Sequence, residues 1–208
     1  MKRVPDSTVR RLSLYLGFLE ELEGRGEKTV SSDVLARLGG TTSAQVRKDL
    51  SIFGSFGKRG LGYLVRELTA SLRDILGLGR DWQVCIVGAG KIGLALAQYP
   101  GFREKGFNVT ALYDSSPAKI GTSLNSVRVR DIRCLAADAS HEQFDIGVIA
   151  VPAAAAQLVA NTMAAAGIKA IMNFAPAQLV VPADIVMRTV NMGLEFEALS
   201  FALANLPK

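Results

Sequence analysis

The chain has 208 residues with the composition of a soluble globular protein, and its length allows one large domain or two small ones. Its net charge of +5 lies entirely within residues 1–80, which predicts a basic module that meets a polyanion, followed by a neutral module in residues 81–208. Two cysteines, Cys85 and Cys134, exclude a disulfide framework and a cysteine metal cluster, and the N-terminus lacks a signal-peptide pattern, so we expect a cytoplasmic protein without a metal.

Three helices are predicted in the first 53 residues. The first has Asp6 and Ser7 as its cap residues and ends before Gly24, the second covers about 31–38, and the third covers about 42–53. A short glycine turn joins the second helix to the third. The pair therefore has the dimensions of a helix-turn-helix motif.

The third helix is the candidate DNA-reading element. Its start fits a capping box, and Val46 and Leu50 would face the core, so that small and basic residues occupy the opposite face. Basic residues on a short helix are also common in ordinary helical domains, where they are only solvated. The predicted DNA-contacting residues of this helix are Thr42, Ser43, Gln45, Arg47, Lys48 and Ser51.

The glycine-rich residues 54–63 predict a tight two-stranded ribbon with Lys58 and Arg59 at its tip. A compact basic tip suits a phosphate or the minor groove, so both residues join the predicted DNA contacts. Together with the uneven charge, the ribbon favours DNA binding over an ordinary helical domain. A further helix over about 65–76 leads to a candidate linker at 77–80.

From Trp82 onward the pattern changes to alternating strands and helices. Such repeats predict an α/β domain with a doubly wound parallel sheet. The uncharged run 146–168 is long enough to span a bilayer, but its β-branched beginning and Ala-rich remainder favour a buried strand followed by a helix. The stretch 126–135 is ambiguous. Strands are predicted over 83–87, 108–113, 145–151 and 169–174, and helices over 92–98 and 153–166.

A G-x-G-x-x-G sequence lies between the first of these strands and the next helix. Gly88 permits a tight turn, Gly90 lets a pyrophosphate approach the backbone, and Gly93 packs the helix on the strand. Asp114 ends the second strand, where a carboxylate would accept hydrogen bonds from the adenosine ribose and repel a 2′-phosphate. This favours NAD over NADP, although a Rossmann core that binds no nucleotide is the alternative.

We therefore predict NADH or NAD⁺ as the ligand. The later strand ends contribute two proline-containing segments that could frame the ribose and the nicotinamide. The predicted cofactor-binding residues are Gly88, Ala89, Gly90, Lys91, Ile92, Gly93, Tyr99, Asp114, Val151, Pro152, Asn173, Phe174, Ala175 and Pro176.

Catalytic groups are scarce around this predicted site. A dehydrogenase needs a proton donor or acceptor near the nicotinamide, and the single histidine, His141, lies in a polar segment expected to be a surface loop or helix start. Tyr99 alone is weak evidence for catalysis. We therefore predict that the protein is not an enzyme. The alternatives are an NAD-dependent oxidoreductase with an accessory helical domain, and a CoA- or nucleotide-binding subunit suggested only by the sheet type.

A last helix over about 193–206 is apolar on nearly every side. Such a helix needs a partner surface, which its own domain or a second copy of the chain would supply, and we expect a homodimer. Its main apolar stripe consists of Phe196, Leu199, Leu203 and Leu206, with Leu194 and Phe201 beside it.

Taken together, these stretches resemble the redox-sensing transcriptional repressor family Rex. The resemblance rests chiefly on residues 45–51, 57–63, 88–93, 99–102 and 173–176. It implies repression of respiratory and fermentative genes through a palindromic double-stranded operator, relieved when NADH rises. It also implies three parts: a winged-helix DNA-binding domain (1–78), an NAD(H)-binding Rossmann domain (79–192) and a dimerisation helix exchanged between subunits (193–208).

Two positions depart from the family pattern. The family commonly carries an arginine where this chain has Gly17, and an aspartate where it has Asn191; the next position, often aromatic, is Met192. The resemblance implies that the charged pair couples cofactor state to the orientation of the DNA-binding domain. Both charges are absent here, which puts the usual switch in doubt.

Overall fold

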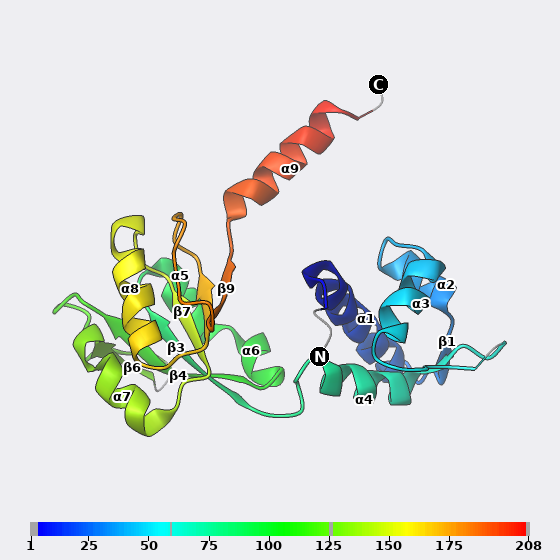
Figure 1. The fold of residues 1–208 in the computed structure, drawn as a ribbon, viewed down its shortest axis with the longest axis horizontal. Helices are drawn as coiled ribbons and strands as arrows, with labels where there is room; N and C mark the ends of the chain where they lie inside the picture. The colour runs from blue at the N-terminus through cyan, green and yellow to red at the C-terminus, as the bar shows by residue number, and fades with distance from the viewer. Residues whose placement is uncertain (1–3, 59, 125–126, 207–208) are drawn as a thin grey trace. The chain divides into compact units, whose positions relative to one another are not determined.

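The computed structural model describes residues 4–58, 60–124 and 127–206 (Figure 1). The chain divides into two compact units, Met1–Arg80 and Asp81–Lys208, and each is described by itself. The predicted DNA contact Arg59 lies outside the described residues.

The first unit is helical, with one small antiparallel sheet. Its apolar helix faces enclose a core that includes Leu12, Leu35, Val46 and Leu68. Its elements are α1 (Asp6–Gly24), β1 (Thr29–Val30), α2 (Ser32–Leu38), α3 (Ser43–Ser51), β2 (Tyr63–Leu64) and α4 (Val65–Ile75).

The helix starts differ in detail from those predicted. Helix α1 begins at Asp6, but Pro5 is its N-cap and provides no side-chain hydrogen bond. In α3, Thr42 Oγ1 accepts a hydrogen bond from the Gln45 N–H at 3.2 Å, as a capping box requires. The Gln45 side chain instead donates to Asp49, so that only half of the predicted box forms.

The glycine-rich ribbon is also shorter than predicted. Strand β2 pairs with β1, and within residues 54–63 a single bridge joins Lys58 to Gly62 among the described residues. A side chain at Gly62, where φ is +83°, would meet the backbone of Val30, so a glycine permits this close approach. The pairing with β1 could not be expected, because that strand has only two residues.

The second unit contains a seven-stranded sheet. It is parallel apart from the antiparallel edge pair β5–β6. The chain builds outward from β3 through β4 to β6 and then crosses back to β7, so that β3 and β7 flank the switch point where ligands of such sheets bind. The order is β5 (Ser123–Leu124), β6 (Val127–Asp131), β4 (Phe107–Asp114), β3 (Trp82–Val87), β7 (Ile146–Ile149), β8 (Ala170–Asn173) and β9 (Val186–Thr189).

Helices alternate with these strands and cover the sheet (Figure 1). They bury a core in which Cys85 is fully enclosed, and burial raises the pKa of its thiol to about 12. The predicted helical N-terminal region and α/β sheet are therefore confirmed. The helices that alternate with the strands are α5 (Lys91–Gln98), α6 (Pro100–Glu104), α7 (Leu135–Glu142) and α8 (Ala153–Ala165), with a 3₁₀ turn at Ile132–Cys134, and α9 (Met192–Ala204) follows the last strand.

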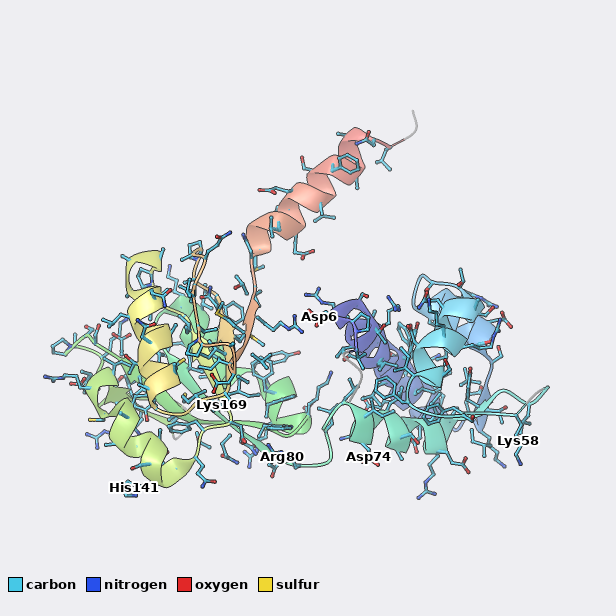
Figure 2. The ribbon with its side chains drawn as sticks, viewed as in Figure 1. Asp6, Lys58, Asp74, Arg80, His141 and Lys169 are labelled. Carbon is cyan, nitrogen blue, oxygen red and sulfur yellow. The ribbon has the colours of Figure 1, made fainter. Side chains whose placement is uncertain are left out.

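Three segments clarify or correct the sequence interpretation. The ambiguous stretch contains strand β6 and the 3₁₀ turn, and His141 lies in the last turn of α7 (Figure 2). The apolar run 146–168 forms β7 and α8. Within the described part of the chain, no helix is both long and apolar enough to cross a membrane.

Helix α9 leaves its apolar residues uncovered. None of its described side chains is buried, and Phe196, Leu199 and Leu203 each expose 60% or more of their surface. An apolar face of this kind is rarely exposed on a soluble monomer.

Candidate functional site

The glycine loop after β3 separates two structural glycines from one that faces open space. A Cβ added at Gly88 would collide with Ala150 O, and one added at Gly93 would collide with Gly88 O. A Cβ at Gly90 would meet nothing within 4 Å. Gly88 and Gly93 thus hold strand, loop and helix together, whereas Gly90 leaves room beside the backbone for a ligand.

The start of α5 offers donors to that space. Gly90 is the N-cap of the helix, and the first turn contains no acidic residue. The free N–H groups and the positive end of the helix dipole therefore favour an anion at this point. Together with the room at Gly90, these donors fit the pyrophosphate of a dinucleotide.

Asp114 lies at the carboxyl end of β4, directly beside this loop. Its Oδ2 accepts hydrogen bonds from the Ala89 N–H and from Lys119 Nζ, each at 2.9 Å, and its Oδ1 accepts one from the Ser116 N–H at 2.9 Å. Burial alone would raise the pKa of Asp114, but the hydrogen bonds from Lys119, Ser116 and Ala89 lower it below its usual value. The carboxylate is therefore held ionised.

A cavity of about 960 Å³ opens at the carboxyl ends of β3, β4, β7 and β8. Its volume and its largely apolar lining with a few polar groups are typical of a small-molecule site. The predicted cofactor residues that line it are Gly88, Gly90, Lys91, Ile92, Asp114, Val151, Pro152, Phe174 and Pro176.

Five predicted residues do not line this cavity: Ala89, Gly93, Tyr99, Asn173 and Ala175. Ala89 is buried and supports Asp114 through its N–H. The fully buried Asn173 side chain donates to the carbonyls of residues 175 and 177 and accepts from the Ala175 N–H, so it shapes the loop after β8. Tyr99 is 58% exposed and packs edge-on against Phe102.

Further lining residues come from segments that the sequence analysis did not assign to the site. On α8 the signal was present, because four lining residues recur at helical spacing and form one face. On the turn after β6 no motif marked them. The additional lining residues are Val87, Ser115, Lys119, Ile132, Arg133, Ala136, Ala150, Ala155, Leu158, Val159 and Thr162.

The two residues named as catalytic candidates for an oxidoreductase lie outside the lining of the cavity. Neither Tyr99 nor His141 lines the cavity, and His141 is exposed on α7. Among residues 4–58, 60–124 and 127–206, no cluster of His, Cys, Asp or Glu could hold a metal ion.

The first unit presents the predicted DNA-contacting face of α3. Arg47, Lys48 and Ser51 are exposed, and Arg47 Nη1 donates to Ser32 Oγ on α2 at 2.9 Å. Lys58 is exposed on the glycine-rich hairpin, where Figure 2 labels it. Thr42 caps the N-terminus of α3, and its neighbour Ser43 is half-buried. The exposed Arg47 and Lys48 give the same helix a basic surface.

Asp49 lies on the same helix but points into the unit. Its side chain is 1% exposed and forms a bidentate ion pair with Arg11 of α1, with Nε–Oδ2 at 2.6 Å and Nη2–Oδ1 at 2.8 Å. Tyr15 Oη donates to Oδ2 at 3.1 Å and Gln45 Nε2 to Oδ1 at 2.8 Å. Gln45, predicted to contact DNA, therefore uses its side chain inside the unit in this structure.

The protonation states of this cluster are fixed by its contacts. Burial alone would raise the pKa of Asp49, but hydrogen bonds from Arg11, Gln45 and Tyr15 lower it below its ordinary value. Burial and the neighbouring carboxylate raise the pKa of Tyr15 to about 12. No pattern in the sequence marked Asp49 as a buried anion.

Two family models match the chain in separate segments. A CoA binding domain matches residues 79–177, and a putative DNA-binding protein N-terminus matches residues 3–51. The first match falls in the second structural unit apart from residues 79–80, and the other match falls in the first unit.

Two relatives that match nearly the whole chain carry the same name. The chain is 44% identical to a redox-sensing transcriptional repressor Rex of Desulfitobacterium hafniense over 96% of this chain and 95% of the relative. It is 46% identical to the protein of the same name from Carboxydothermus hydrogenoformans, over 96% of each chain. These relatives are named as repressors and not as enzymes.

Solved structures of a Rex-family repressor named RSP resemble the whole chain. The complex of RSP with β-NAD⁺ and operator DNA has a TM-score of 0.93 and 37% identity, covering 98% of this chain and 94% of RSP. The complex of RSP with β-NADH has a TM-score of 0.89 and 35% identity, covering 98% and 95%.

Proposed function

The chain belongs to the Rex family of redox-sensing transcriptional repressors, and we propose that it binds a palindromic operator and releases it when NADH binds. The observation that carries the proposal is the open space at Gly90, beside the N-terminus of α5, in the same chain as an exposed basic helix α3. One polypeptide thus holds an anion cradle for a dinucleotide and a surface for DNA.

In this proposal the first 78 residues form the DNA-binding domain. Arg47, Lys48 and Ser51 face the major groove, while Lys58 and Arg59 reach a phosphate or the minor groove. Thr42 and Ser43 direct the start of α3 at the phosphate backbone. The Gln45 side chain donates one N–H to Asp49, which leaves its second N–H and its Oε1 for a contact with DNA.

Residues 79–192 bind the cofactor. The backbone at Gly88, Gly90, Lys91 and Ile92 holds the pyrophosphate, and Asp114 accepts a hydrogen bond from the adenosine ribose. NAD⁺ and NADH differ only at the nicotinamide, which is cationic in the first and neutral in the second. Val151, Pro152, Phe174 and Pro176, at the ends of β7 and β8, would frame that ring.

Residues 193–208 supply the dimer contact. The uncovered apolar side chains of α9 support a homodimer in which this helix packs against the partner subunit. A two-fold dimer would place two α3 helices about 34–36 Å apart in successive major grooves of the palindrome. A regulator of this kind acts on chromosomal DNA, which places it in the cytoplasm.

Binding of NADH and binding of DNA then weaken each other by the same factor, because the two equilibria are linked. If NADH favours a dimer whose α3 helices no longer match the operator spacing, DNA must weaken NADH binding by the same factor. Coupling of about 1–3 kcal/mol corresponds to a change in affinity of roughly 5- to 150-fold.

A competition titration tests this proposal. A duplex selected by the protein from a randomised palindromic library is titrated by fluorescence anisotropy at one salt concentration, with NADH, with NAD⁺ and without cofactor. NADH should raise the operator Kd by about 5-fold or more, and NAD⁺ should not. Duplex binding that ignores NADH while calorimetry shows NADH bound would remove the sensing role. Failure to bind any duplex at low salt would remove the repressor role.

A further inference from the structure

Asp114 is not an isolated carboxylate at the predicted ribose position. Lys119 Nζ lies 2.9 Å from its Oδ2, and both residues line the cavity. Arg133 also lines the cavity and pairs with Asp131, which is the neighbour of Asp114 across the β4–β6 ladder. Each of the two carboxylates, Asp114 and Asp131, is therefore paired with a cation, and the charges of these four side chains balance.

This charge balance removes part of the argument for NAD over NADP. A lone carboxylate would repel a 2′-phosphate, but here the charge of Asp114 is offset by an ammonium group in contact with it. The preference for NAD must then come from hydrogen bonds to the ribose hydroxyls. A carboxylate accepts about four hydrogen bonds, and three sites on Asp114 are already used by Ala89, Ser116 and Lys119, which leaves about one for a ribose hydroxyl.

Lys119 can supply the complementary contact. Its ammonium carries three donors, one of which is directed at Asp114, and 44% of the side chain remains exposed at the cavity. A vicinal diol offers hydroxyl oxygens that accept as well as hydroxyl protons that donate. An adjacent acceptor and donor at one corner therefore match the two hydroxyls of one ribose.

We propose that Lys119 is a second ligand of the adenosine ribose and that the Asp114–Lys119 pair, and not Asp114 alone, sets the preference for NAD(H) over NADP(H). The inference rests on the proposed binding of NAD(H). Without Asp114, the cavity keeps Lys119 and Arg133 with one anion fewer. It then has the charge and the donors of a site for a 2′-phosphate.

Calorimetric titration of five proteins with NADH, NAD⁺ and NADPH tests the pair. The proteins are the native chain, Lys119→Met, Asp114→Ser and the double variant, with Lys105→Met as the control because Lys105 is exposed and does not line the cavity. Lys119→Met should weaken NADH and NAD⁺ by the same factor, about tenfold, because both contain the same ribose. Lys105→Met should bind like the native chain.

The decisive comparison is NADPH binding by the two Asp114 variants. Asp114→Ser should bind NADPH about tenfold or more tightly than the native chain, and the double variant should lose that gain. Should Asp114→Ser fold poorly by circular dichroism, Asp114→Asn with and without Lys119→Met provides the same comparison. The inference is overturned if native affinity for NADH survives Lys119→Met, or if a gain in NADPH binding does not depend on Lys119. A native chain that binds no NADH at all would instead overturn the proposed function.

Discussion

Arg11 of α1 and Asp49 of α3 form a bidentate ion pair inside the first unit, with the Arg11 Nε only 2.6 Å from Asp49 Oδ2. The pair fixes the candidate recognition helix to the first helix of the chain at the position next to Lys48. Because Arg11 is one-quarter exposed and Asp49 is buried, the carboxylate depends on its partners to remain charged away from water.

Asp49→Asn should therefore destabilise the first unit and weaken operator binding. The substitution keeps the shape but removes the charge that Arg11 faces, at an expected cost of about 1–3 kcal/mol in the free energy of unfolding. Urea unfolding measures that cost, and operator affinity is measured in buffer where circular dichroism shows the variant folded. Asp33→Asn, a change at an exposed carboxylate in α2, is the matched control.

The same variant has a predicted pH signature. The pKa of Asp49 is lowered on folding, so its contribution to stability is present above its unfolded pKa of about 3.9 and is lost as pH falls through the folded pKa. The stability difference between the native chain and Asp49→Asn should accordingly shrink below about pH 4. A difference that stays constant down to pH 2 would contradict the assigned role.

Two substitutions in the glycine loop should separate an effect on NADH affinity from an effect on the stability of the fold. At Gly90 an added methyl group meets open space, so Gly90→Ala should leave thermal stability unchanged and weaken NADH binding by about tenfold or more through contact with the pyrophosphate. Gly93→Ala should destabilise by about 1–3 kcal/mol, because its methyl group would collide with the Gly88 carbonyl. Scanning calorimetry with and without NADH checks both. Equal loss of stability in the two variants would contradict this division.

Lys48→Ala should reduce the salt dependence of operator binding. Removal of one phosphate contact lowers the slope of log K against log salt by about 1 and weakens all duplexes alike. Anisotropy titrations at four salt concentrations give the slope. Arg103→Ala, which removes an exposed charge from the second unit, should leave the slope unchanged.

The apolar surface of α9 predicts an oligomer. Phe196→Glu together with Leu203→Glu places charges where a partner surface is expected, and should convert a dimer into a 22.2 kDa monomer in sedimentation velocity. Glu197→Gln is the control on the same helix. A native chain that sediments as a monomer at micromolar concentration would contradict the proposed dimer.

Two family departures predict weak coupling between cofactor and DNA. A Cβ added at Gly17 would meet nothing within 4 Å, and Asn191 caps α9 by accepting the Gly193 N–H at 2.9 Å, which an aspartate also does. Gly17→Arg with Asn191→Asp should therefore fold normally. It should increase the factor by which NADH weakens operator binding, whereas either single change should not. If the double variant responds to NADH as the native chain does, these two positions do not form the switch.

The parts of the fold with strong local patterns were predictable from the sequence. The strand, glycine loop and helix around Gly88 and the amphipathic helices α2 and α3 carry periodicity that one segment reveals by itself. Strand β9 was not predicted, because at the sheet edge Val186 and its neighbours remain largely exposed and show no buried alternation. The two-residue strands β1 and β5 are too short to show any period.

The residues of the candidate sites also differ in how far the sequence could identify them. The glycine loop and Asp114 belong to a contiguous motif and could be identified, whereas Lys119 and Arg133 reach the cavity through the tertiary fold. Asp49 resembles a solvated residue on a polar helix face until Arg11, 38 positions earlier, is placed beside it. Pairings between distant segments depend on how helices pack, which residue spacing within one segment cannot reveal.

The hydrogen bonds at Asp114 affect how strongly a dinucleotide would bind. Its carboxylate is oriented by two backbone amides before any ligand arrives, so little conformational entropy remains to be lost when the adenosine half docks. Such a pre-organised anchor treats oxidised and reduced forms alike and sets only the overall strength of binding. Discrimination between the two redox states must then arise at the far end of the molecule, and changes at one end can tune sensitivity to total cofactor without altering sensitivity to its redox ratio.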